Sequence, residues 1–241
     1  MKCNVWAMAM AAVLGGGLAA QADSISYDAP LASPGYYNGS GNPNGGFTIS
    51  TNNSIEIGLR AKLRSSLAVI DSSNNVYVVP AGSQPGSPTH AAWNYEFSIN
   101  LRNAIPAPTL TLADITTSLT VTDLTKGITS TAVDVLNHFG DDSSYDGTSH
   151  PGLIVSGAWG AQNSENPAFS SFPLASSYDE NVPDRYLFTL NVNDKSGALL
   201  ASDTIEVDVA PLPSSVWGGM ALLGCVGATA GMKRLRRPAI A

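Results

Sequence analysis

One short acidic segment has the residue types and the spacing of a calcium loop. Asp142, Ser144 and Asp146 occupy alternate positions, and Gly147 follows them. Alternate oxygen-bearing side chains can converge on one hard cation, while a glycine allows the sharp turn that this requires. The twelfth position of such a loop takes a bidentate glutamate, and here it is Leu153. The segment carries half of the motif, so the alternative to a Ca²⁺ site is a plain acidic turn.

The histidines are the second group that could do chemistry. His90, His138 and His150 are the three in the chain. They form no HExxH pair of the kind that binds zinc, and the chain has no GxSxG segment that would expose a nucleophilic serine. A Ser-His-Asp triad can still be assembled in space from distant residues. We therefore expect no catalytic residue and a non-enzymatic protein, and we keep a secreted hydrolase with a triad built across loops as one alternative.

Two tryptophans differ in their expected setting. Trp93 begins a run in which every second residue is apolar, so it is predicted to face the core. Trp159 is flanked by small residues and could be exposed in a loop, where it could stack on a sugar. A surface module that binds carbohydrate or calcium is accordingly a second alternative.

Charge is unevenly distributed along the chain. All 19 acidic residues lie between positions 23 and 209, together with only seven of the 12 basic ones. A strongly acidic region repels nucleic acid, so no nucleic-acid partner is expected. Cys3 and Cys225 are the two cysteines, and both lie outside this region. Disulfides, thiol catalysis and cysteine-type zinc sites are therefore excluded from it.

The dominant pattern of this region is the period of two that half-buried antiparallel strands show. The clearest alternating runs are 54–63, 93–101, 185–192 and 203–209. Shorter candidate strands are 47–50, 76–79, 118–122 and 152–156, and 193–197 is predicted as a hairpin loop. Ser-, Pro- and Gly-rich stretches at 81–89 and 162–180 indicate loops, and short helical turns are predicted within 112–115 and 130–139. We therefore expect an all-β fold, a two-sheet antiparallel β-sandwich of the immunoglobulin-like or jelly-roll kind.

The N-terminus is predicted to be a secretory signal peptide over residues 1–22. Lys2 precedes an apolar run of small residues, and Ala20 and Ala22 give the small-x-small pattern that a signal peptidase accepts. Residues 23–46 are predicted to be an irregular lead-in with one short strand at most. The sandwich domain is expected to span 47–209.

The C-terminal segment 210–241 has the features of a membrane anchor. Residues 215–232 carry no charge and are long enough for a single transmembrane helix across a thin bilayer. The basic residues Lys233, Arg234, Arg236 and Arg237 follow, and such a cluster stays on the cytoplasmic side. We expect the acidic domain outside the inner membrane and the basic end inside. One interpretation of the segment is an ordinary stop-transfer anchor, and the alternative is a tail that is cut by a protease.

The same tail resembles a known sorting signal. It contains Pro211, Leu212, Pro213, Ser214, Ser215 and Trp217, followed by the apolar span and the basic end. This order is similar to the PEP-CTERM sorting domain, in the variant with leucine in the middle of its Pro-x-Pro motif. The resemblance covers 211–237, and it departs from the common motif at Leu212, where glutamate is usual.

The resemblance implies a route and a setting for the protein. Such proteins are exported, held in the inner membrane, and processed by an exosortase-type protease-transpeptidase. They are associated with the bacterial envelope, the cell surface and the exopolysaccharide matrix. We therefore expect a non-enzymatic envelope or surface protein, structural or adhesive in the extracellular matrix, whose partners are the exosortase, the inner membrane and exopolysaccharide.

Overall fold

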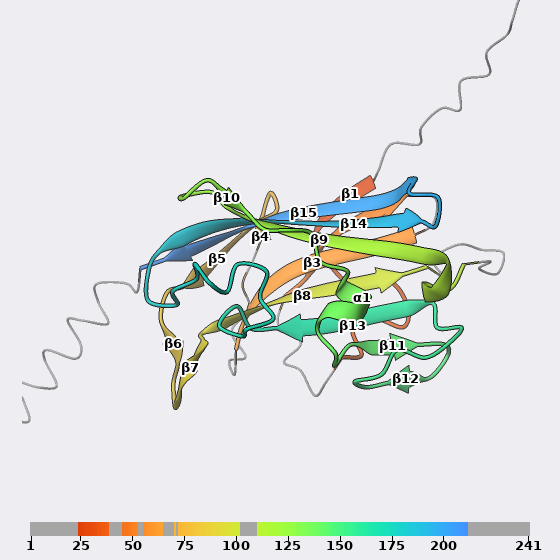
Figure 1. Ribbon diagram of the computed structural model, residues 1–241, viewed down its shortest axis with the longest axis horizontal. Helices are drawn as coiled ribbons and strands as arrows, with labels where there is room; N and C mark the ends of the chain where they lie inside the picture. Colours follow the sequence, from red (N-terminus) through yellow and green to blue (C-terminus); the bar gives the residue numbers. More distant parts are fainter. Residues whose placement is uncertain are drawn as a thin grey trace, which may run out of the picture.

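The computed structural model describes residues 24–38, 45–52, 55–64, 70, 72–101 and 110–211. The expected signal peptide with Ala20 and Ala22, the membrane segment 215–232 and the basic cluster lie outside these residues. No helix within the described part of the chain is long and apolar enough to span a membrane. The described part is all-β, as the alternating runs predict (Figure 1).

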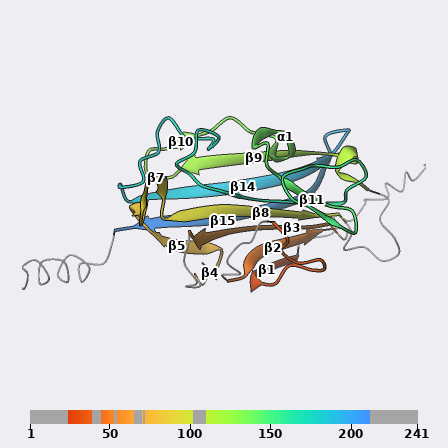
Figure 2. The ribbon, with the colours of Figure 1, turned by 90° about the horizontal axis from the view of Figure 1, so that it is seen from below.

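Two large sheets form the two layers of the fold, as Figures 1 and 2 show. In the described residues the first sheet has seven strands, in the order β1 (Ser24–Ala29), β2 (Phe47–Asn52), β3 (Ile55–Leu63), β8 (Trp93–Asn100), β13 (Gly160–Glu165), β11 (Ser143–Tyr145) and β12 (Ser149–His150). The second has six, in the order β10 (Ile128–Thr129), β9 (Ile115–Asp123), β14 (Asp184–Asp194), β15 (Leu199–Ala210), β5 (Val76–Pro80) and β4 (Ser72–Ser73). A separate hairpin joins β6 (Ser83–Gln84) to β7 (Ser87–Ala91).

Strand pairing is antiparallel with one exception. β15 pairs with β5 in parallel, over Glu206 to Ala210 and Val76 to Pro80. Every other pairing between the described strands is antiparallel, including the hairpin of β14 and β15 whose loop the sequence predicts at 193–197. The expected antiparallel arrangement is therefore present in the described pairings except at this one, where β5 and β15 run in the same direction.

The hydrophobic core lies between the two sheets. The predicted stripe of β8 faces it, since Trp93, Tyr95 and Phe97 are each 1% exposed. Trp93 and Tyr95 contact Phe188 of β14 with ring centroids 6.4 Å and 5.0 Å apart. Rings of this size bury the largest apolar areas available, so this aromatic contact holds the layers together.

Polar groups also tie the two sheets. The backbone N–H of Leu59 donates to Asp203 Oδ2 at 2.9 Å, and that of Thr48 donates to the hydroxyl of Tyr77 at 2.9 Å. Asp203 and Tyr77 belong to the second sheet and are buried. They satisfy strand N–H groups of the first sheet that would otherwise be buried without a partner.

The central strands β3 and β8 are buried on both faces, which the half-buried interpretation of their alternation did not predict. Their polar side chains, including Arg60, Lys62 and Glu96, are as covered as their apolar ones. The cover is the segment 30–38, which we call the strap, because it crosses the outer face of the first sheet and hydrogen-bonds to it. The chain ahead of residue 47 thus contributes both the strap and the short strand β1.

Several short predictions differ from the structure. Residues 152–156 form turns rather than a strand, while the stretch predicted as a loop from Gln162 onward begins inside β13. The predicted loop at 81–89 contains the β6–β7 hairpin. The predicted helical turns are present as the 3₁₀ turn η1 (Leu112–Asp114) and as α1 (Val135–His138), which Asp134 caps through its side chain.

Candidate functional site

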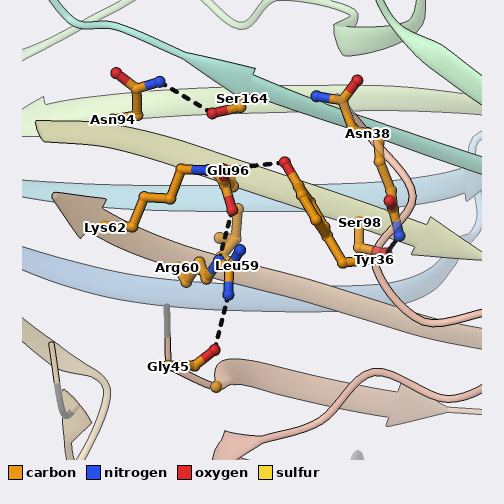
Figure 3. Close-up of polar contacts among 12 residues, drawn as sticks. Tyr36, Asn38, Gly45, Leu59, Arg60, Lys62, Asn94, Glu96, Ser98 and Ser164 are labelled. Carbon is orange, nitrogen blue, oxygen red and sulfur yellow. Dashed lines mark hydrogen bonds and ion pairs between the residues drawn. The ribbon is translucent and has the colours of Figure 1, made fainter. Parts of the chain in front are cut away.

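Glu96 is the centre of a buried charged network on the outer face of the first sheet (Figure 3). Arg60 lies directly opposite it on β3, and Arg60 Nε is 2.5 Å from Glu96 Oε2. Lys62 pairs with the other carboxylate oxygen, Oε1. Because Glu96 is fully buried, the two cations compensate for the hydration that its carboxylate has lost.

The strap closes over this network. The hydroxyl of Tyr36 donates to Glu96 Oε1 at 3.0 Å, as Figure 3 shows. The Arg60 guanidinium lies 4.9 Å from the Tyr36 ring and 4.2 Å from that of Phe47, within cation–π range. Burial, and then the charge of Glu96, raise the pKa of the Tyr36 phenol far above its ordinary value. The phenol therefore stays protonated and keeps its role as a donor.

Two further contacts fasten the strap. The N–H of Ala32 lies 3.1 Å from both oxygens of Glu56, and the N–H of Tyr37 donates to Gln162 at 2.8 Å. A hollow of about 190 Å³ remains beside the strap, lined in part by Leu31, Tyr36, Phe47 and Arg60. The Glu96 network is thus a buried contact between the strap and the sheet, in which one carboxylate is paired with two cations.

The three predicted calcium ligands lie on and beside β11, and their oxygens have separate hydrogen-bond partners. Asp142 Oδ1 accepts from Asn163 at 2.9 Å, while Ser144 Oγ donates to the Leu153 carbonyl at 2.7 Å. Asp146 accepts from the N–H of Thr148 and from His150. The structure brings Asp142 together with another set of residues instead.

That other set is a cluster of carboxyl groups that the sequence did not indicate. Asn163 Nδ2 lies 2.9 Å from Asp141 Oδ1, 2.9 Å from Asp142 Oδ1 and 3.0 Å from Glu165 Oε1. Asp142 and Glu165 are buried, and Asp141 is exposed at the rim. We call Asp141, Asp142, Asn163 and Glu165 the carboxyl cluster. Burial raises the pKa of Asp142 to about 7 and that of Glu165 to about 8, and the nearby Asp141 charge adds to both shifts.

The histidines have ordinary partners. His90 contacts the hydroxyls of Ser87 and Thr89, and His150 Nε2 lies 3.0 Å from Asp146 Oδ1. His138 Nε2 lies 2.7 Å from the carbonyl oxygen of Ser171. Within the described residues no histidine joins a serine hydroxyl to a carboxylate, so this arrangement assembles no triad.

A second hollow and Trp159 have their own surroundings in the fold. A hollow of about 450 Å³ is lined by η1, α1 and residues 154–156, with Asp134 and Lys195 at its wall. Asp134 caps α1, and Lys195 Nζ donates to the Ile115 carbonyl at 2.7 Å. Trp159 is buried and packs edge-on against Tyr145, so the expected exposed position is wrong.

The predicted sorting motif begins where the described fold ends. β15 ends at Ala210, and Pro211 follows as an exposed residue. Leu212, Pro213, Ser214, Ser215 and Trp217 lie outside the described residues. No protein-family model matches the chain, and a search of curated proteins finds no match.

Proposed function

We propose that this protein is a non-enzymatic, exported envelope protein that an exosortase-type enzyme sorts to the cell surface through its C-terminal tail. Its role there is structural or adhesive within the extracellular matrix. We also assign its fold to the two-sheet β-sandwiches, immunoglobulin-like or jelly-roll in kind. The supporting observation is the junction at Ala210, where the last strand ends and the Pro-Leu-Pro motif follows directly.

The position of β15 within its sheet determines how far the domain can lie from an anchored tail. β15 is an interior strand, paired with β14 on one side and with β5 on the other. Two flanking strands hold its end near Ala210, so a membrane-anchored tail would keep the domain close to the bilayer. A domain held this way reaches the outer surface only after the tail is cut, which is the step that the tail resemblance implies.

The exported part also suits a matrix role. Its core, polar inter-sheet ties and buried strap contacts make a rigid body without disulfides. Excess acidic charge keeps such a domain apart from anionic headgroups.

Substitution of the motif prolines tests the sorting step. In native cells we expect Pro211→Ala combined with Pro213→Ala to accumulate as an uncut protein in the inner membrane, because the protease recognition site is altered. Pro151→Ala is the matched control, since Pro151 is an exposed proline far from the tail in the sequence. Equal amounts of both variants in the surface fraction, each with the mass of the protein cut at its tail, would reject the proposal.

A further inference from the structure

The carboxyl cluster contains more acceptors than its amide can satisfy. A side-chain amide nitrogen carries two hydrogens, yet Asn163 Nδ2 has three carboxyl oxygens within 3.0 Å. Among the described residues no lysine or arginine forms an ion pair with Asp141, Asp142 or Glu165. Two buried carboxylates without a cation are costly, and a proton placed between carboxyl groups removes that cost.

The groups that face the cluster do not supply a positive charge to it. Tyr95 of β8 is the register partner of Glu165, and its buried hydroxyl has no hydrogen-bond partner. Ser171 Oγ donates to Glu165 Oε2 at 3.3 Å. From the α1 segment, the Asp134 carboxylate adds further negative charge, and His138 lies against the Ser171 carbonyl. Protons are therefore the remaining means of balancing the cluster.

The cluster lies where two surface segments meet the sheet. It holds residues 139–142, which follow α1, and the loop 166–178, which contains Ser171, beside β13. Under these segments the rings of Phe139 and Phe172 pack on Tyr95, with centroids 6.4 Å and 5.7 Å away. Release of either segment would uncover an aromatic part of the core.

We propose that protons held on Asp142 and Glu165, beside the Asp141 carboxylate, form a latch that holds residues 139–142 and the loop 166–178 on the first sheet, and that alkaline solution opens it. When the protons leave, three carboxylates face one amide nitrogen and repel one another. The segments then separate from β13, while the rest of the two-sheet core stays folded. The latch is a property of the fold and does not depend on the sorting proposal.

The direction of the pH effect follows from proton linkage. The pKa of Asp142 is about 7 and that of Glu165 is about 8. Both are raised above the pKa of carboxyl groups in the unfolded chain, which is about 4. The folded protein then binds more protons than the unfolded one between about pH 4 and about pH 8, so its stability falls as pH rises through this range. Above the folded pKa values the loss is complete.

The test is thermal unfolding of the full-length protein in detergent, followed from about pH 5.5 to about pH 9. We expect the wild-type Tm to fall by about 5 °C or more, since a few kcal/mol shifts Tm by that amount in a domain of this size. Glu165→Gln and Asp142→Asn imitate the protonated groups, so each should flatten this slope and raise Tm at the alkaline end. Glu206→Gln, which changes a carboxylate paired with Arg185 on the second sheet, should keep the wild-type slope.

A second measurement covers the case in which the variants fold poorly. Hydrogen exchange of the wild-type protein, corrected for the intrinsic effect of pH, should show protection lost at 139–142 and 166–178 before β14 and β15 open. Wild-type slopes in both variants, or uniform loss of protection, would overturn the proposal.

Discussion

Both carboxylate oxygens of Glu96 are paired with cations, and the side chain is fully buried. We therefore expect its replacement to lower the stability of the fold. Replacing it with glutamine leaves Arg60 and Lys62 buried beside a neutral group. Removing one partner of a buried ion pair costs on the order of 3 kcal/mol, because the remaining charge is uncompensated. We expect Glu96→Gln to lower the free energy of unfolding in urea by about that amount.

A surface pair is the control for Glu96. Glu206 lies 2.6 Å from Arg185 across β14 and β15, with the Arg185 side chain more than half exposed. Exposed pairs contribute about 1 kcal/mol or less, so Glu206→Gln should have a small effect. Equal losses in the free energy of unfolding for the two variants would show that the buried Glu96 network stabilises the fold no more than a surface pair does.

At the residue scale the sequence located one member of the carboxyl cluster and missed the others. Asp142 stood out by its spacing from Ser144 and Asp146, but these three side chains have separate hydrogen-bond partners. Glu165 comes from a segment whose polar composition indicated a loop. The register of β11 with β13, in which Ser143 lies opposite Gln162, places Asp142 beside Asn163. No local pattern encodes that pairing.

The elements show the same division between local and long-range information. The long alternating runs predicted β3, β8, β14 and β15, because one face of each packs against the opposite sheet. The strap was not predicted, since its contacts with Glu56, Glu96 and Gln162 join residues 24 to 125 positions apart. Strand β13 was missed because its inward face carries Asn163 and Glu165 rather than apolar side chains.

The docking of β1 supplies a test at the element scale. A Cβ added at Gly46 would lie 2.2 Å from the Asp28 carbonyl carbon and 2.5 Å from the Ala29 nitrogen, both in the backbone of β1. Gly46→Ala must therefore displace β1 from β2. We expect a loss of about 2 kcal/mol in the free energy of unfolding, typical of overpacking, together with faster hydrogen exchange in Ser24–Ala29.

Gly35→Ala provides the comparison for Gly46. Gly35 has a φ of +79° and open space around its Cβ position, so alanine there meets backbone strain but no collision. We expect a cost of about 1 kcal/mol without faster exchange in β1. If exchange in β1 were unchanged in Gly46→Ala, the close approach of Gly46 and β1 would not hold in solution.

For the whole molecule, the decisive feature is the junction at Ala210 between the two-sheet fold and the proposed sorting tail. The core, the strap and the inter-sheet hydrogen bonds describe how the two-sheet domain is built. The tail residues Pro211 to Arg237 carry the proposed destination, and that proposal comes from their order in the sequence. Surface placement requires that the two parts be separated by cleavage.

The intact mass of the protein recovered from fractionated native cells tests this account most directly. We expect a mass that ends near Pro213, found in the outer-membrane or extracellular fraction, because the tail is removed during sorting. A mass that ends at Ala241, found in the inner membrane alone, would contradict it, and the tail would then be a plain anchor for a periplasmic domain.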